Sequence, residues 1–243
     1  MNDLEILCPG TLPLIGGRYR HYKGNEYTVL AVGRHSEDLS PQVIYRAEYG
    51  TREIWVRPLS MFLESVEKDG KVRRRFACLS GELFRPAVAP ETDAVAELYR
   101  SCVGLPGCTW DESYPTREMA VQDIAAGDLY VLYSGETLIG TVSLIDHDDL
   151  DGLPVWRGSG KPAVLVRPGV TPALQHRGWG TKLLAYALKA AWEHGADSVR
   201  LLCGTENKNA FSMYCHAGFE VRGEAEMYRH RYFCMERIKR NGE

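Results

Sequence analysis

The residues best suited to chemistry form a glycine-punctuated turn, Gln175 to Thr181, which leads directly into a run with helical apolar periodicity. Gly178 and Gly180 carry no Cβ, so a ligand can approach the backbone closely there. NH groups at the start of a helix point outward together, and the helix dipole adds partial positive charge. The turn therefore predicts a site for a phosphate or pyrophosphate, with Arg177 and His176 as further donors. An ordinary loop-to-helix turn is the alternative if the glycine pair is considered alone.

The predicted strand before this turn, residues 163–171, is interrupted by a proline and a glycine, Pro168-Gly169. Proline cannot donate to a sheet ladder and glycine loosens it, so we expect this strand to bulge and to part from a neighbour. The separated backbone NH and C=O groups of Gly169, Val170 and Thr171 would then be free to pair with a ligand.

Three features follow one another in the second part of the chain. They are Gln175-x-x-Gly178-x-Gly180 between a strand and a helix, a strand that ends at Cys203, and Asn207-x-x-Ala210-x-x-x-Tyr214-x-x-x-Gly218-Phe219. In this order and spacing they resemble the GNAT superfamily of acyl-CoA-dependent N-acetyltransferases, from about residue 82 to 238. The resemblance implies a GNAT-like mixed α/β (α+β) sheet with flanking helices, and acetyl-CoA as co-substrate.

The resemblance also implies a role for each part of the site. The pantetheine amides would pair with the backbone near Gly169 to Thr171, and the pyrophosphate would lie on the NH groups of residues 176–181. Tyr214 would face the thioester sulfur as general acid, although a core tyrosine at helical spacing is the alternative. The implied cofactor-binding residues are Gly169, Val170, Thr171, Gln175, His176, Arg177, Gly178, Trp179, Gly180, Thr181 and Asn207.

The general base is the part of the reaction for which the family pattern offers no residue. Many members carry a glutamate on the strand before the turn, and here that position falls near Val164, in a stretch without an acid. Water could relay the proton, another residue could take it, or the amine could arrive neutral. His147 and Asp146, at the end of the preceding strand, are base candidates by position, with a solvated loop residue as the alternative for each.

The loop around His147 is acidic, with Asp146, Asp148, Asp149 and Asp151 within six residues. Such a group of carboxylates could attract a cationic amine toward the thioester by electrostatic steering. The acceptor itself is not specified by any motif. The residues that would select it lie on the least patterned loops, 104–115 and 146–161.

The elements that must position these residues alternate between strands and helices from Glu82 onward. The two glycine residues at 195 and 218 end predicted helices. The predicted helices are 90–102, 117–126, 182–194 and 207–217, and the predicted strands are 83–88, 129–133, 137–145, 163–171, 198–203, 221–225 and 232–238.

The first part of the chain is predicted to be a separate small all-β domain. Five short strands between residues 18 and 76 suggest an SH3-like barrel, so we divide the chain into domains 1–78 and 79–243. This part resembles a small bacterial domain of unknown function over residues 17–76, on the motifs Tyr19-Arg20-His21-Tyr22-Lys23-Gly24, Val43-Ile44-Tyr45-Arg46-Ala47 and Trp55-Val56-Arg57-Pro58. Its many aromatic and basic residues either fill the core and rim of the barrel or form a binding face.

The composition is that of a soluble globular protein, which we expect to stay in the cytoplasm. A net charge of −3 disfavours nucleic acid as a partner, and no apolar stretch is long enough for a membrane span. Acidic residues at the N-terminus argue against a signal peptide. Seven scattered cysteines without a Cys-x-x-Cys pair predict reduced thiols and no metal site. A homodimer is compatible with the sequence.

Together these observations predict an N-acetyltransferase that moves an acetyl group from acetyl-CoA directly to a primary amine of a small molecule or a protein. An acyl-CoA-binding sensor without turnover, with the barrel as partner-binding module, is the alternative from another class. The missing strand carboxylate favours the sensor, whereas Tyr214 favours catalysis. A nucleic-acid-binding barrel is a third hypothesis, supported only by the aromatic and arginine content.

Overall fold

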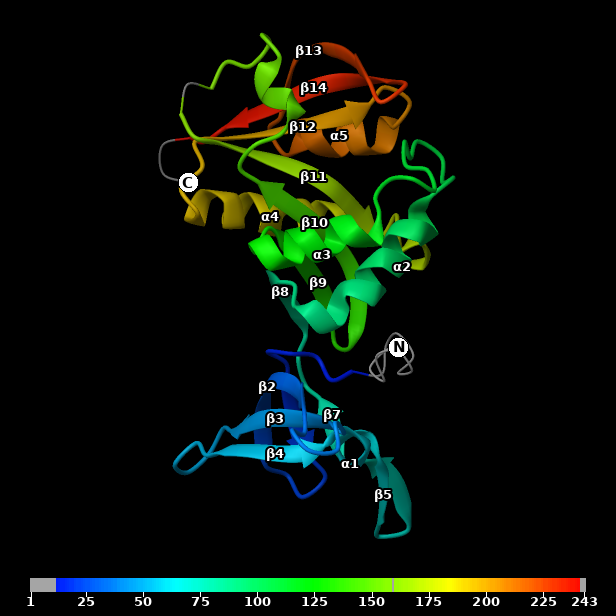
Figure 1. Cartoon of the computed structure of the whole chain (residues 1–243), viewed down its shortest axis with the longest axis vertical. Coiled ribbons are helices and arrows are strands. Elements are labelled where there is room, and N and C mark those ends of the chain that lie inside the picture. The colour runs from blue at the N-terminus through cyan, green and yellow to red at the C-terminus, as the bar shows by residue number, and fades with distance from the viewer. Residues whose placement is uncertain (1–11, 159, 241–243) are drawn as a thin grey trace. The chain divides into compact units, whose positions relative to one another are not determined.

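The computed structural model describes residues 12–158 and 160–240, which form two compact units (Figure 1). Unit 1 extends to Leu83 and includes the segment Tyr133–Leu138. Unit 2 comprises Phe84–Leu132 and the chain from Ile139 onward. None of the helices in the described ranges has both the length and the apolarity that crossing a membrane requires.

Unit 1 is built on an antiparallel sheet with strand order β4-β3-β2-β1-β7. Strands β3 and β4 form a hairpin across Gly50, in which Tyr45 lies opposite Trp55. The sheet strands are β1 (Arg18–His21), β2 (Glu26–Arg34), β3 (Pro41–Ala47), β4 (Ile54–Pro58) and β7 (Phe76–Cys78); helix α1 (Leu59–Leu63) and a separate hairpin of β5 (Ser65–Lys68) and β6 (Lys71–Arg74) complete the unit.

One face of this sheet carries an aromatic core. Strand alternation places every second side chain on this face. Tyr19, Tyr45, Phe62 and Phe76 are all buried, and the rings of Phe62 and Phe76 stack with centroids 4.1 Å apart. The Tyr19 hydroxyl accepts a hydrogen bond from the Leu14 NH at 2.7 Å, so this buried phenol is satisfied. Several of the aromatic residues noted in the sequence therefore fill the core.

The all-β character predicted for this part is confirmed apart from α1, but the SH3-like barrel is not found. Within the described residues, β4 and β7 are the edges of an open sheet. Residues Val72 to Phe76 do not form one strand, because β6 pairs with β5 and only β7 joins the main sheet. Alternation identifies strands, whereas closure depends on tilt and stagger between strands that are distant in sequence.

Unit 2 carries most of a mixed seven-stranded sheet with strand order β13-β14-β12-β11-β10-β9-β8. Strands β11 and β12 are parallel, whereas the pairs β10–β11, β12–β14 and β13–β14 are antiparallel. The strands are β8 (Glu82–Pro86), β9 (Leu129–Ser134), β10 (Thr137–Ile145), β11 (Pro162–Val170), β12 (Ser198–Gly204), β13 (Glu220–Met227) and β14 (His230–Ile238), and the helices are α2 (Thr92–Cys102), α3 (Arg117–Ala126), α4 (Trp179–Glu193) and α5 (Lys208–His216).

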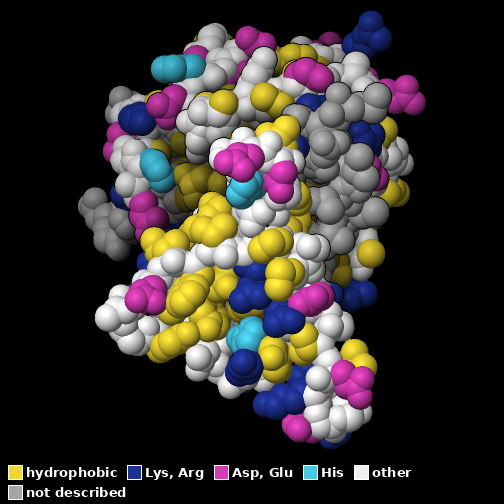
Figure 2. All heavy atoms as spheres, turned by 60° about the horizontal axis from the view of Figure 1, so that its bottom comes forward, with side chains coloured by type: hydrophobic (Ala, Val, Ile, Leu, Met, Phe, Trp, Pro, Cys, Tyr) yellow, Lys and Arg dark blue, Asp and Glu magenta, His cyan; other side chains and the backbone are white. Residues whose placement is uncertain are grey.

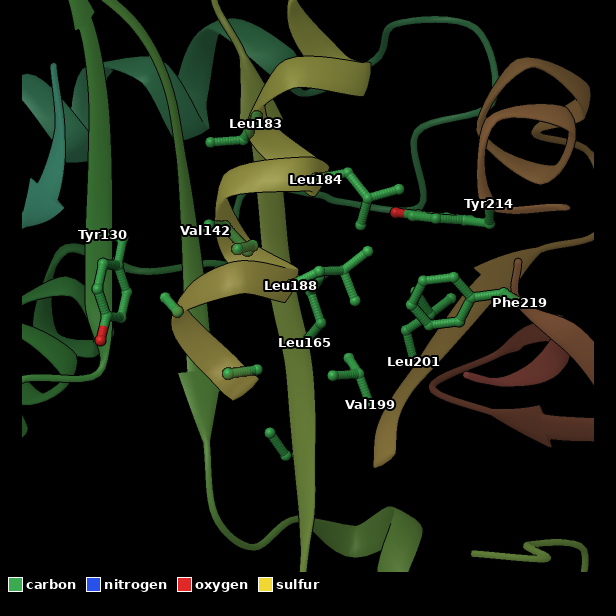
Figure 3. Close-up of a cluster of buried hydrophobic side chains, with 14 of the residues drawn as sticks. Tyr130, Val142, Leu165, Leu183, Leu184, Leu188, Val199, Leu201, Tyr214 and Phe219 are labelled. Carbon is green, nitrogen blue, oxygen red and sulfur yellow. The ribbon is translucent and has the colours of Figure 1, made fainter. Parts of the chain in front are cut away.

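Helix α4 is fixed to the sheet by its apolar stripe. Leu183, Leu184 and Leu188 are each at most 4% exposed, and Leu188 lies beside Leu165 of β11 (Figure 3). Burying a leucine contributes roughly 1.5–3 kcal/mol, so this stripe alone holds the helix firmly in place. The helix begins at Trp179, three residues before the predicted start at Lys182. The stripe thereby fixes the position of the helix that follows the glycine turn.

Strands β11 and β12 part after Val164, ahead of Pro168-Gly169, where the sequence predicted the break. They pair only from Pro162 opposite Ser198 to Val164 opposite Arg200. The register of β10 with β11 shifts between Thr141 and Ser143, which marks a bulge in β11. A bulge bends the strand locally. The rest of β11, beyond Val164, is not paired with β12.

Candidate active site

A pocket of about 680 Å³ lies in unit 2 where β11 and β12 part. It is bounded by the end of β11, the first turn of α4, the end of β12, helix α5 and the loop after α2. Among its lining residues are Gly169, Val170, Gln175, His176, Gly178, Gly180, Thr181, Asn207 and Tyr214. Residues that the sequence analysis chose from three separate segments thus line one cavity. Thr171, Arg177 and Trp179 are not among the lining residues.

The first turn of α4 offers backbone donors to this pocket. Gly178 has φ 82° and His176 has φ 58°, both left-handed, so the chain turns sharply before the helix. The NH of Lys182 donates to the Gly178 carbonyl at 3.1 Å, and NH groups before it lack an acceptor within the helix. A Cβ at Gly180 would lie 3.2 Å from the Met213 Sδ of α5. The arrangement fits a pyrophosphate, since donors and the positive end of the dipole coincide.

Gly169, Val170 and Thr171 were expected to have free backbone groups. Of these three residues, Val170 alone can offer its NH to the gap between β11 and β12. The Thr171 NH donates to the Ile139 carbonyl at 2.9 Å. Alternate residues of an antiparallel strand face opposite edges, so the NH of Val170 points toward the parting β12. The Val170 carbonyl accepts a hydrogen bond from Gln175 Nε2 at 3.0 Å. Val170 thus contributes a donor, and Gln175 ties the strand end to the turn.

Asn207 has its amide oxygen committed to the helix that follows it. As N-cap of α5, its Oδ1 accepts the Ala210 NH at 3.0 Å. The loop after α2 passes close by, because a Cβ at Gly107 would lie 3.0 Å from the Asn207 Cα. Gly107 also has φ 78°, so glycine is required there on two grounds. A contact of Asn207 with a ligand is therefore left to its amide nitrogen, which is a donor.

Tyr214 lies on α5 with its ring buried and its hydroxyl directed toward Leu184 of α4 (Figure 3). Its ring packs edge to face on Phe219, with centroids 5.7 Å apart. Burial raises the pKa of Tyr214, and the neighbouring Cys203 acts in the same direction. The phenol therefore keeps its proton at neutral pH, which a proton donor at this pocket must do.

A buried ion pair that the sequence analysis missed holds the β11 bulge. Arg167, with φ 52°, is the left-handed residue of the bulge. Its Nη2 and Nε donate to Asp123 Oδ2 of α3 at 2.6 and 3.1 Å, and both side chains are 11% exposed. The Ser143 hydroxyl donates to the same oxygen at 2.5 Å. Although burial acts to lower it, the charge of Asp123 raises the pKa of Arg167, so the guanidinium stays charged.

One signal in the sequence could have pointed to this pair. Arg167 follows the apolar run Ala163 to Val166 and precedes Pro168 directly, where an arginine is otherwise out of place. A charged residue in a buried strand needs a partner. The identity of that partner, 44 residues away along the chain, was not accessible to any local pattern.

The two base candidates lie outside the pocket-lining set. His147 is 88% exposed, with its Nδ1 3.2 Å from Asp151 Oδ2. Asp146 Oδ2 lies 3.4 Å from the Lys161 amine. Both therefore sit in solvated loop positions, and the geometry offers no support for either as the base. None of the residues that line the pocket is an aspartate or a glutamate.

The acidic loop does contain one carboxyl with an unusual environment, that of Asp148. Burial raises the pKa of Asp148, and the charge of Arg167 acts against this rise. Its Oδ1 accepts the NH of Asp149 at 2.6 Å, and Asp149 Oδ2 in turn accepts a hydrogen bond from the Tyr228 hydroxyl at 3.0 Å. The loop, the β13–β14 turn and the β11 bulge therefore form one electrostatically connected region.

Comparison with known proteins agrees with this geometry. The model of the "Acetyltransferase (GNAT) family" matches residues 92–219, and that of a "Protein of unknown function (DUF1653)" matches residues 17–78. The uncharacterized N-acetyltransferase YvbK of Bacillus subtilis (strain 168) is 22% identical over 108 residues, which are 44% of this chain and 63% of that relative. The chain thus spans less than two thirds of the curated relative.

Two solved structures share the fold of unit 2. YncA, a putative acetyltransferase from Salmonella typhimurium with its cofactor acetyl-CoA, gives a TM-score of 0.53 at 18% identity, covering 65% of this chain and 94% of that chain. A GNAT family acetyltransferase from Streptococcus agalactiae 2603 gives 0.56 at 19% identity, covering 67% and 98%. At these identities the likeness establishes the fold, whereas the family model covers more than half of the 243 residues. The chain therefore belongs to the GNAT family of acetyltransferases.

Proposed function

We propose that this protein is an N-acetyltransferase that moves the acetyl group of acetyl-CoA directly to a primary amine. The observation that carries the proposal is the convergence of three groups on one pocket. They are the helix end with its outward NH groups, the Val170 NH at the strand gap, and the protonated hydroxyl of Tyr214. An anion, a carbonyl oxygen and a leaving sulfur are the partners that these groups suit.

In the reaction, the neutral amine nitrogen attacks the thioester carbon and forms the new C–N bond. The Val170 NH steadies the oxyanion of the tetrahedral intermediate. The C–S bond then breaks, and the sulfur leaves as coenzyme A with a proton from Tyr214, which water restores. The excess proton of the amine leaves through water, since the lining residues include no carboxylate.

The test is release of coenzyme A across a panel of amines, measured with a thiol reagent. The panel includes polyamines, amino acids, aminoglycosides and peptides with a free N-terminus or a lysine. We expect release with at least one class. Binding of acetyl-CoA without release for any amine would instead support the acyl-CoA sensor, for which the absence of a lining carboxylate is the supporting observation.

A finer prediction concerns a cationic acceptor attracted by Asp148 and Asp149. Changing both to asparagine keeps the hydrogen bond of Asp148 but removes two charges. We expect KM for the amine to rise about 3- to 10-fold at low salt, and the difference from wild type to vanish at high salt. The matched control removes two exposed charges from unit 1, Glu37→Gln with Asp69→Asn. An equal rise in that control, or an unchanged KM in the first variant, would remove the steering hypothesis.

A further inference from the structure

Strand β4 of unit 1 presents an apolar edge without a partner. It pairs with β3 on one side, and no strand among residues 12–158 and 160–240 pairs with its other side. Three consecutive apolar residues on it are exposed, Ile54 by 62%, Trp55 by 48% and Val56 by 62%. Figure 2 shows hydrophobic side chains exposed together on the surface in its lower half. Exposed edge strands are normally protected by charged residues or by short length, because their unpaired backbone groups can pair with a strand of another chain.

The backbone of this edge is arranged to pair again. The Ala47 NH donates to the Glu53 carbonyl at 2.9 Å, so Glu53 is bonded to β3. By alternation, Trp55 and Arg57 also direct their backbone groups to β3, whereas Ile54 and Val56 direct their NH and C=O groups away from the sheet. Two residues thus offer two donors and two acceptors to an incoming strand.

A second copy of the same strand satisfies these groups when it is antiparallel and centred on Trp55. In that register Ile54 lies opposite Val56 of the second copy, and the reverse holds by symmetry. Both residues have outward backbone groups, so each pair makes two NH···O bonds. Trp55 meets Trp55 of the second copy as a non-hydrogen-bonded pair, the type in which side chains lie closest. Only this register places Ile54 of one copy opposite Val56 of the other and Val56 opposite Ile54.

The charged side chains of the strand are also complementary in this register. The same register places Glu53 opposite Arg57 of the second copy, twice in the dimer. The Glu53 side chain is exposed. Arg57 makes one hydrogen bond, from its Nε to the Tyr45 hydroxyl at 3.1 Å, and lies 5.9 Å from the Phe76 ring centre. Opposite charges directly across strands stabilise a pair, and like charges destabilise it.

We propose that the chain forms a symmetric homodimer through antiparallel pairing of β4 with β4 of a second copy, which joins two five-stranded sheets into one. An unrelated extended peptide could use the same backbone groups. It would lack the reciprocal Glu53 and Arg57 at matching positions, which only the chain's own reversed strand supplies. The proposal concerns unit 1 and is independent of the acetyltransferase activity of unit 2.

The experiment is sedimentation velocity on the full chain over a concentration series, with charge reversals at the edge. Wild type should change from one copy to two as concentration rises. Glu53→Arg and Arg57→Glu should each raise the dimer dissociation constant about tenfold or more, because each creates two like-charge pairs. An equimolar mixture of the two variants should dimerise with an affinity within about threefold of wild type, since both cross pairs are again opposite in charge.

Controls separate loss of the interface from loss of folding. Glu37→Arg makes the same charge change on an exposed loop of unit 1 and should leave the dissociation constant unchanged. Ile54→Lys, which leaves both charges in place, should weaken the dimer. Circular dichroism checks that each variant folds, and recovery in the mixture is itself impossible for a misfolded chain. A wild type that stays monomeric, or a dimer insensitive to both Glu53→Arg and Ile54→Lys, would overturn the proposal.

Discussion

Replacing Tyr214 with phenylalanine should lower kcat on the order of 100-fold, while KM for acetyl-CoA stays within about threefold of wild type. The change removes one oxygen atom and leaves the ring on Phe219, so the packing of α5 is preserved. What is lost is the proton for the leaving sulfur. Steady-state kinetics with an amine found in the panel would measure both constants.

The control for this variant is Tyr130→Phe, which removes a phenol from the same core cluster away from the pocket. Its hydroxyl is on β9, and we expect kcat to stay within about twofold of wild type. An unchanged kcat in Tyr214→Phe would exclude the hydroxyl as general acid. It would leave Tyr214 as a packing residue, the alternative that the sequence already offered.

Replacing Asp123 with asparagine should reduce the free energy of unfolding by about 3–5 kcal/mol, because it leaves the buried guanidinium of Arg167 without its counter-charge. The same variant should raise KM for acetyl-CoA, since Arg167 holds the bulge that turns the Val170 NH toward the gap. Urea unfolding and steady-state kinetics would measure the two effects.

An exposed ion pair in the same unit provides the comparison. Arg117 Nε donates to Asp93 Oδ1 at 2.7 Å, with side chains 43% and 52% exposed. Asp93→Asn should cost less than about 1 kcal/mol, because water already screens this pair. Adding Arg167→Met to Asp123→Asn should restore part of the lost stability, since the unpaired charge is then gone. An equal cost for Asp123→Asn and Asp93→Asn would show that the buried pair does not support the bulge.

The grouping of most predicted donor-site residues around one pocket could be predicted from the sequence, because the signals for these residues are local. Gly178 and Gly180 lie within the turn that they shape, and Pro168-Gly169 marks the strand break in its own segment. The helix that Asn207 caps also carries Tyr214, and its signals likewise lie within one short segment. Each of these features depends on residues a few positions apart, which periodicity and turn chemistry can detect.

What could not be predicted depends on residues far apart in the chain. Asp123 and Arg167 meet through packing of α3 on the sheet, and the pairing of β7 with β1 joins the two ends of unit 1. The proximity of His147 to the predicted strand end also suggested a base, although the structure leaves its ring in solvent. The position of a residue in the sequence indicates which strand, helix or loop it belongs to, but not where a loop places its side chain.

The hydrogen bond from Gln175 Nε2 to the Val170 carbonyl has a consequence for how a two-part ligand is held. The bond links the end of β11 to the turn that leads into α4, so the distance between the NH groups of these two segments is set before any ligand arrives. A molecule that reaches both positions binds its second end at a high effective concentration and loses little further freedom. This fixed distance therefore favours the binding of a whole coenzyme over the binding of either half alone.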